Sequence, residues 1–230
     1  MVAHTRGQQW PAVLVALAVA TSVCVALVVV RVVRTGTTDY AFLVWNLVLA
    51  WVPFMLAVGL WGGYHRGASR WLLGTLGVTW LLFLPNAPYI VTDFVHLDRG
   101  APVPMWFDSL AIGAAAATGL LLGFASVYLI EAVLDRSLGR RVMWPFTLGV
   151  LGLASVGIYL GRFQRLNSWD ALRHPHLLLD MARERMAHPL SNHTLLLVTV
   201  LFTLALTLAY TAICTYVLPR VALNRRRQAR

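Results

Sequence analysis

The sequence of 230 residues contains no lysine, few acidic residues and few cysteines. All 19 of its basic residues are arginine, 9 residues are acidic, and charged residues make up 12% of the chain. Soluble globular domains average about 25% charged residues, so this is not the composition of an ordinary soluble domain. The chain is instead 59% hydrophobic, with a mean hydropathy of +0.69. Its apolar residues concentrate in runs of about 20, the length that crosses a bilayer.

The two cysteines, Cys24 and Cys214, both lie within apolar runs. Cys24 is expected deep in the first span, and Cys214 near the cytoplasmic end of the last one. This separation argues against a disulfide and against a two-cysteine metal site. The net charge is +10, and five arginines lie in the tail after residue 218. The positive-inside rule and anionic headgroups account for these arginines without nucleic acid.

Hydropathy predicts an all-α integral membrane protein in which residues 1–230 form one multi-pass domain. After the third span we expect a re-entrant or interfacial polar helix. After the fifth span we expect an interfacial helix over residues 176–187. A basic cytoplasmic tail, residues 219–230, follows the last span. The six predicted transmembrane helices lie at about 11–33, 40–61, 70–84, 106–130, 142–160 and 193–218.

Six spans place both termini on one side of the membrane. That side then holds 11 arginines and the other side holds 8, so the positive-inside rule favours cytoplasmic termini and a place in the cell membrane. In either orientation, the loops after spans one, three and five share one face. With cytoplasmic termini, that face is the non-cytoplasmic one.

Small residues recur at intervals of four within two spans. They are Ala115, Gly119 and Gly123 in span four, and Gly157 and Gly161 in span five. This spacing lets helix backbones approach closely in lipid. We therefore expect these faces to pack against other helices.

Polar residues inside the spans are few. Asn46 in span two is expected to form an interhelical hydrogen bond. Span six carries threonines at intervals of four, which either bond the preceding helical turn, join helices or line a hydrophilic path. These are Thr199, Thr203, Thr207, Thr211 and Thr215.

A polar segment, residues 84–97, interrupts the apolar pattern after span three. Ionisable groups at membrane depth are costly, and they usually face a protein interior or a water-filled cavity. Pro85 ends the span because proline cannot continue a helix. Asn86 is expected to cap a short helix that has Pro88 in its first position.

An α-helical period after this cap places Tyr89, Asp93 and His96 close to one face. Asp93 and His96 are three residues apart, so their side chains can touch. Such a pair tunes a general base or binds a metal, and the structural alternative is a hydrogen-bonded pair that only holds the helix. A metal needs about two more ligands. No histidine has diagnostic spacing, so we predict no metal site.

A second polar segment follows span five. Arg162 and Arg165 lie three residues apart at the end of that span. Their planar guanidinium groups can converge on one anion, or each can reach separately to the lipid headgroups.

The same segment continues into a predicted short helix, which is capped by Asn167 or Ser168. Trp169 is expected to anchor at the membrane interface. Asp170 either pairs with Arg165 or contributes to the cap.

Both segments resemble the DUF1361 family of bacterial integral membrane proteins. The resemblance rests on Leu-Pro-Asn-Ala-Pro-Tyr-Ile with Thr-Asp and His-Leu in residues 84–97, followed by Arg162-Phe163 and by Asn-Ser-Trp-Asp at 167–170. It covers most of the chain, from about span two to span six. It implies a multi-pass membrane protein whose polar residues act as one unit, and it carries no established reaction.

The first functional hypothesis is binding or processing of an anionic lipid or lipid-linked substrate on the non-cytoplasmic face. The alternatives are a non-catalytic scaffold or assembly factor, and a small proton-coupled transporter or channel. An enzyme would need a nucleophile or metal beyond the catalytic candidates Asp93 and His96. The sequence specifies no cofactor, and the expected partner is the lipid bilayer with its anionic headgroups. The candidate ligand-binding residues are Asn86, Tyr89, Asp93, His96, Asp108, Arg162, Arg165, Asn167, Trp169 and Asp170.

Overall fold

A computed structural model describes residues 9–97, 102–138, 140–164 and 193–216. Within these ranges the chain forms helices and no strand. Six helical stretches are long and apolar enough to cross a membrane, which confirms the predicted number. They are Val13–Thr35, Ala41–His65, Arg70–His96, Met105–Asp135, Val142–Phe163 and His193–Ile213. The chain is therefore a multi-pass, all-helical membrane protein.

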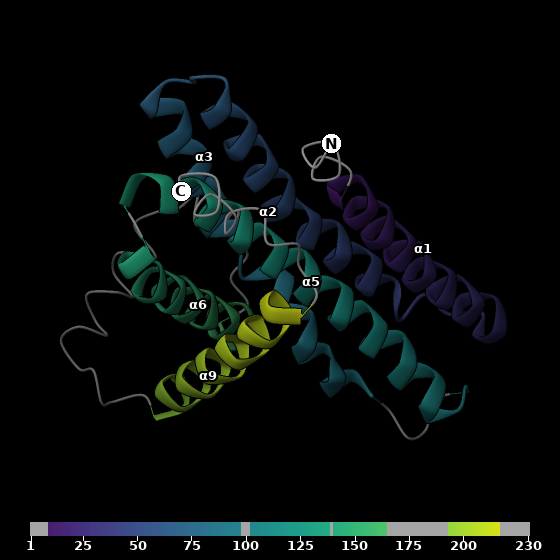
Figure 1. Cartoon of the computed structure of the whole chain (residues 1–230). Coiled ribbons are helices and arrows are strands. Elements are labelled where there is room, and N and C mark those ends of the chain that lie inside the picture. The colour runs from purple at the N-terminus through teal and green to yellow at the C-terminus, as the bar shows by residue number, and fades with distance from the viewer. Residues whose placement is uncertain (1–8, 98–101, 139, 165–192, 217–230) are drawn as a thin grey trace.

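The helices are arranged around α5, which runs through the middle of the bundle (Figure 1). The helix α2 and the broken third span pack along it, and α1 and α6 flank it, while α9 lies mainly on α6. The bounds are α1 Gln9–Thr35, α2 Ala41–His65, α3 Arg70–Phe83, α4 Asn86–Tyr89, the 3-10 helix η1 Ile90–His96, α5 Met105–Leu138, α6 Arg140–Phe163 and α9 His193–Tyr216.

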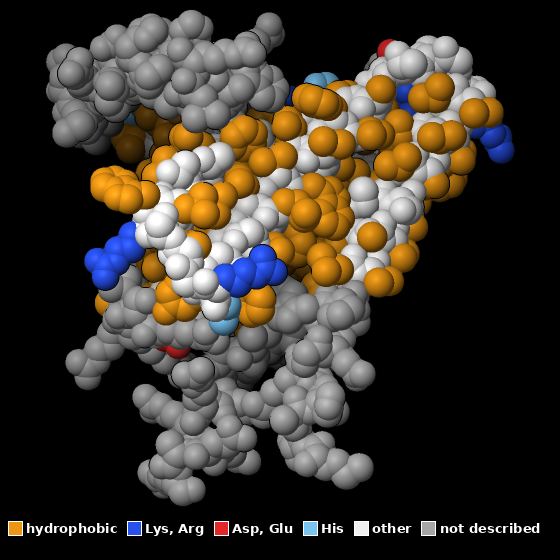
Figure 2. Space-filling model, turned by 90° about the horizontal axis from the view of Figure 1, so that it is seen from above, with side chains coloured by type: hydrophobic (Ala, Val, Ile, Leu, Met, Phe, Trp, Pro, Cys, Tyr) orange, Lys and Arg blue, Asp and Glu red, His pale blue; other side chains and the backbone are white. Residues whose placement is uncertain are grey.

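The hydrophobic core lies between α2 and α5. Leu43 and Phe54 of α2 and Ile112 and Leu122 of α5 are completely buried. Large apolar side chains also cover the outside of the bundle, and Figure 2 shows one face on which they predominate. Since such a surface suits lipid tails and not water, the outer apolar residues are those expected of a membrane-embedded bundle.

The third span is broken but continuous. Its first helix, α3, has 14 residues and covers only about 21 Å, less than the roughly 30 Å of a bilayer core. The chain then continues through α4 and η1, running antiparallel to α5. The Trp80 indole N–H donates to the Ser126 hydroxyl at 3.0 Å, and further along Phe94 approaches Gly113. The polar segment therefore extends the span beyond the predicted end at Leu84, and it forms the second half of the crossing.

Glycines make room for the break in this span. A Cβ on Gly119 would lie 2.6 Å from the Ala87 carbonyl oxygen, and one on Gly157 would lie 2.4 Å from Pro85 Cγ. Both distances are shorter than any van der Waals contact allows. The predicted close packing is confirmed, and its partner is the break at Pro85–Ala87.

The threonines of α9 bond their own helix at two positions. The Thr203 hydroxyl donates to the Thr199 carbonyl at 2.6 Å, and the Thr211 hydroxyl donates to the Thr207 carbonyl at 2.7 Å. This confirms the first of the predicted roles, bonding to the preceding turn, for these two residues.

Candidate functional site

Asp93 is the centre of the candidate site, and it is buried inside the third span. The residue is only 1% exposed. Its carboxylate oxygen Oδ2 accepts a hydrogen bond of 2.8 Å from the Asn46 side-chain amide of α2. Asn46 therefore forms the predicted interhelical hydrogen bond. It holds the Asp93 carboxylate in place by a bond that joins the second and third spans.

His96 lies next to Asp93 because η1 is a 3-10 helix, in which residues three apart align. Its Nδ1 is 3.9 Å from Asp93 Oδ1 and 3.2 Å from the Asp93 backbone carbonyl oxygen. A carbonyl oxygen only accepts, so this bond requires a proton on Nδ1. The His96 side chain is 44% exposed, which leaves the imidazole accessible.

Tyr89 does not share this face, which corrects the prediction made from an α-helical period. With three residues per turn, Asp93 aligns with Ile90 and His96, and the Tyr89 ring packs against the hydrophobic core. Thr92 bonds back to the Tyr89 carbonyl at 2.7 Å. The polar surface of the segment is therefore narrower than predicted.

Asn86 also has a different role from the predicted helix cap. The N-cap of α4 is Pro85, which provides no side-chain bond, and Asn86 is the first residue of the helix. The Asn86 amide donates to the Phe83 carbonyl at 2.9 Å. Asn86 thus satisfies a carbonyl that the break in the third span would otherwise expose, because the last turn of a helix lacks backbone donors.

Arg162 lies in the last turn of α6, where it is half-buried. Its positive charge interacts electrostatically with the carboxylate of Asp93. Arg162 is therefore near enough to Asp93 for its charge to act there, but among the described residues no hydrogen bond or ion pair joins the two side chains. The remaining candidates lie outside the described residues, as does the predicted interfacial helix at 176–187; they are Arg165, Asn167, Trp169 and Asp170.

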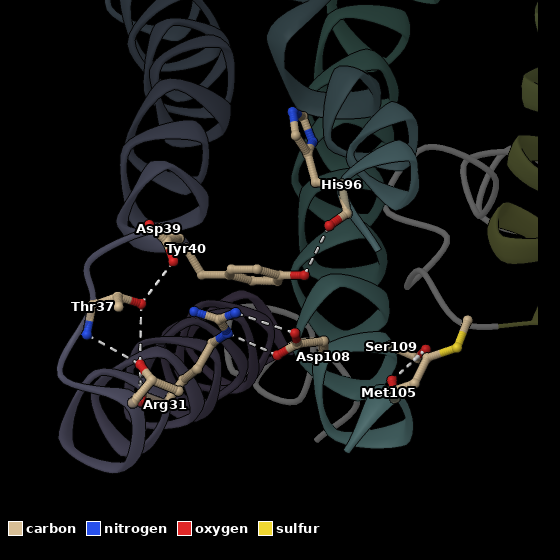
Figure 3. Close-up of polar contacts among 9 residues, drawn as sticks. Arg31, Thr37, Asp39, Tyr40, His96, Met105, Asp108 and Ser109 are labelled. Carbon is tan, nitrogen blue, oxygen red and sulfur yellow. Dashed lines mark hydrogen bonds and ion pairs between the residues drawn. The ribbon is translucent and has the colours of Figure 1, made fainter. Parts of the chain in front are cut away.

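Asp108 pairs with Arg31, which the positive-inside rule only counted among the eight arginines on the non-cytoplasmic side. Arg31 Nε and Nη2 donate to the two Asp108 carboxylate oxygens at 2.8 and 3.3 Å. The two residues are 3% and 1% exposed. Figure 3 shows the pair between the end of α1 and the start of α5. One signal was available in the sequence. Arg31 lies near the end of the first apolar run and Asp108 near the start of the fourth, and six spans place these two positions on the same side of the membrane.

Tyr40 connects this ion pair to His96. The Arg31 guanidinium carbon lies 3.7 Å from the centre of the Tyr40 ring, a cation–π contact. The Tyr40 hydroxyl donates to the His96 backbone carbonyl at 3.1 Å (Figure 3). We call the region formed by residues 31–40, 93–97 and 105–109 the Arg31 end. Contacts among four spans meet there, and the region includes the candidate residues Asp93, His96 and Asp108.

The comparison with protein families identifies the chain. A family model described as "Protein of unknown function (DUF1361)" matches residues 45–208. The chain belongs to this family. No curated protein and no solved structure matches it. The matched range of the DUF1361 chain includes every candidate site residue and begins after Arg31.

The arrangement in this DUF1361 protein suits two chemical tasks. The half-buried Arg162 can receive an anion, because its planar fork pairs with phosphate or carboxylate oxygens. His96 Nε2 can accept a proton while Asp93 steadies the resulting positive charge. Among the residues that the structure describes, no group of three or more His, Cys, Asp and Glu side chains is placed to hold a metal.

Proposed function

We propose that this membrane protein binds the anionic headgroup of a lipid or lipid-linked substrate beside Arg162, on the non-cytoplasmic face. The observation that carries the proposal is that Arg162 of the fifth span acts electrostatically on Asp93 of the third span, beside which the accessible His96 lies. A cation, a buried carboxylate and an accessible imidazole thus lie in one region, where the polar half of the third span ends. Ionisable groups in such a position mark a functional site by default.

The charges at this site favour an anionic ligand. Arg162 interacts with Asp93, and that carboxylate already accepts a bond from Asn46. The half-buried guanidinium has five N–H groups in a fixed fork, which suits the oxygens of a phosphate or carboxylate ligand. Partial burial strengthens the attraction because the local dielectric is lower than that of water.

Processing of the bound group would use His96 as the proton acceptor. The hydrogen bond to the Asp93 carbonyl uses Nδ1 and not Nε2, and the side chain is 44% exposed. A bound headgroup hydroxyl or phosphate within hydrogen-bond reach of Nε2 would exchange a proton with it. Proton transfer therefore requires that the headgroup is bound first.

A non-catalytic scaffold is the second candidate, and one observation favours it. The two buried carboxylates at the Arg31 end, Asp93 and Asp108, already have partners within the protein. Groups saturated in this way fix helix positions without any ligand. The back-bonded Thr203 and Thr211 give less support to the third candidate, a transport path along α9.

Native mass spectrometry on gently solubilised protein tests the proposal. Wild type is reconstituted in nanodiscs that mix phosphatidylglycerol with phosphatidylcholine, and bound lipid is then measured. We expect retained phosphatidylglycerol, with at least a tenfold loss of occupancy in Arg162→Ala and a smaller loss in Asp93→Asn/His96→Ala. The matched controls are Arg70→Ala and His65→Ala, which change the same residue types at the opposite end of α2 and α3.

Equal lipid occupancy in wild type, Arg162→Ala and the controls would contradict the headgroup proposal. If the site variants also melt earlier than the controls, the scaffold becomes the better account.

A further inference from the structure

Glu131 forms a second polar cluster, far from the candidate site. It lies on α5, 18 positions beyond Gly113, which Phe94 approaches; this corresponds to about 27 Å along the helix. Its oxygen Oε2 accepts a hydrogen bond of 2.8 Å from the Tyr210 hydroxyl of α9. Its oxygen Oε1 is hydrogen-bonded to the Thr147 hydroxyl of α6. One carboxyl group thus joins three spans.

The partners of Glu131 differ from those of the other buried acids. Asp108 has the guanidinium of Arg31, and Asp93 has the Asn46 amide, the nearby His96 ring and the charge of Arg162. Of the ion pairs found among the described residues, neither includes Glu131. A carboxylate inside a candidate span without a counter-charge is costly, so such a group normally takes a proton.

Counting hydroxyl protons at Thr147 leads to the same conclusion. A threonine hydroxyl has one proton to donate. The Thr147 oxygen is 2.9 Å from the Met143 carbonyl oxygen, which can only accept. When the Thr147 proton is used there, the bond between Thr147 and Glu131 needs a proton from Glu131. A protonated Glu131 then donates to Thr147, accepts from Tyr210, and leaves every group in the cluster satisfied.

We propose that Glu131 is a proton-binding site that fastens α9 and α6 to α5. The bound proton completes a chain of hydrogen bonds from Tyr210 through Glu131 and Thr147 to the Met143 carbonyl. The helix α9 packs mainly on α6 and makes few contacts with α5. The hydrogen bond from Tyr210 to Glu131 is therefore one of the few direct links between α9 and the central helix. Loss of the proton leaves Thr147 with one proton for two acceptors and loosens the tie.

The titratable and charged groups near Glu131 come from α5, α9 and α6. On α5 the negative charge of Asp135 acts on Glu131, which disfavours a second carboxylate charge. On α9 the facing titratable group is Tyr210. The helix α6 begins with Arg140 and Arg141, whose side chains lie outside the described part. An ionised Glu131 paired with one of these arginines is therefore the competing arrangement.

Infrared spectroscopy of the full chain in lipid nanodiscs at neutral pH decides between the two arrangements. A protonated carboxylic acid has a C=O stretching band that a carboxylate lacks. We expect this band in wild type, a downshift in heavy water, and its loss in Glu131→Gln. Tyr210→Phe should move the band to higher frequency, because the hydroxyl that donates to the C=O oxygen is gone. Tyr40→Phe is the matched control and should leave it unchanged.

Thermal unfolding adds a second readout. A glutamine amide can donate an N–H to Thr147 and accept from Tyr210, as the protonated acid does, so Glu131→Gln should melt within about 2 °C of wild type. The same change at the paired acid, Asp108→Asn, leaves Arg31 without its counter-charge and should lower the melting temperature by far more. A wild-type spectrum with no band lost in Glu131→Gln, or a Glu131→Gln that melts as early as Asp108→Asn, would overturn the proposal.

Discussion

The two ends of α5 each carry a membrane-embedded acid, and they stabilise it in different ways. Asp108 is held by the opposite charge of Arg31, with a tyrosine ring over the guanidinium. Glu131 is held by the hydroxyl groups of Thr147 and Tyr210. A buried ion pair keeps both charges only while both partners are present. A carboxyl among hydroxyls can instead change its charge by taking up or releasing a proton. The contacts of Asp108 thus form a permanent ion pair, whereas the hydrogen bonds of Glu131 depend on whether it carries a proton.

Removing Arg31 should have the largest effect on stability, because it breaks the buried ion pair with Asp108. In Arg31→Ala the Asp108 carboxylate stays buried without its counter-charge, and we expect a loss of about 3–5 kcal/mol in unfolding free energy. Denaturant unfolding in detergent micelles measures this loss. The control is Arg34→Ala, an exposed arginine one turn later, which should change stability by less than about 0.5 kcal/mol. Similar stabilities for the two variants would show that the ion pair contributes little.

The glycines that accommodate the third span should follow in size. Gly157→Ala forces a methyl group into the Pro85 ring, and we expect a loss of about 1–3 kcal/mol. Gly149→Ala lies on the same helix with nothing within 4 Å of the added methyl, so it serves as the matched control. It should be neutral or slightly stabilising because alanine favours helix. If Gly157→Ala is equally neutral, α4 packs less tightly against α6 than described.

The bond that positions Asp93 gives an intermediate effect. Asn46→Ala leaves the buried Asp93 oxygen without its donor, and such a loss costs about 1–3 kcal/mol. Ser109→Ala removes an exposed hydroxyl that bonds the Met105 carbonyl and should cost less than about 0.5 kcal/mol. Chemical unfolding measures the loss of stability in both variants. The larger loss in Asn46→Ala is expected because its bond is interhelical and leaves a buried oxygen without a donor. Equal losses would mean that Asp93 finds another donor.

Two tyrosine variants give the smallest and most discriminating effects. Tyr40→Phe removes a neutral bond to the His96 carbonyl, with an expected loss of about 0.5–1.5 kcal/mol. Tyr210→Phe removes the bond to Glu131 and should cost the same if Glu131 is protonated. Hydrogen bonds to charged groups contribute about 1.5–3 kcal/mol. A clearly larger loss in Tyr210→Phe would therefore indicate an ionised Glu131.

Hydropathy was sufficient for the number of spans, and Pro85 was sufficient for the break in the third one, because both depend on local sequence. The contact between Asp93 and His96 also follows from spacing, since residues three apart meet in either helix type. Tyr89 was misplaced because the segment forms a 3-10 helix, whose three-residue period differs from the α-helical one. Nothing in the local sequence distinguishes the two periods over seven residues.

The missed contacts are those between distant parts of the chain. Arg31 and Asp108 are 77 residues apart, and Glu131 meets Tyr210 across 79 residues. A single sequence shows that such residues end or interrupt apolar runs, but not which helices face each other. Asn86 was misassigned for a related reason. Its amide donates to the end of the preceding helix. The geometry of the break depends on its close packing against Gly119 of α5 and Gly157 of α6, which the local sequence does not show.

The burial of Arg31 has a consequence for how the chain is made. Its counter-ion, Asp108, is 77 residues further on. At a synthesis rate of about 5–20 residues per second, Arg31 leaves the ribosome roughly 4–15 s before Asp108 does. During that interval the arginine has no carboxylate partner in the bilayer, where an unpaired charge is costly. We expect the first span to remain close to the insertion machinery or the headgroups until the fourth span arrives, so that the two enter their final positions together.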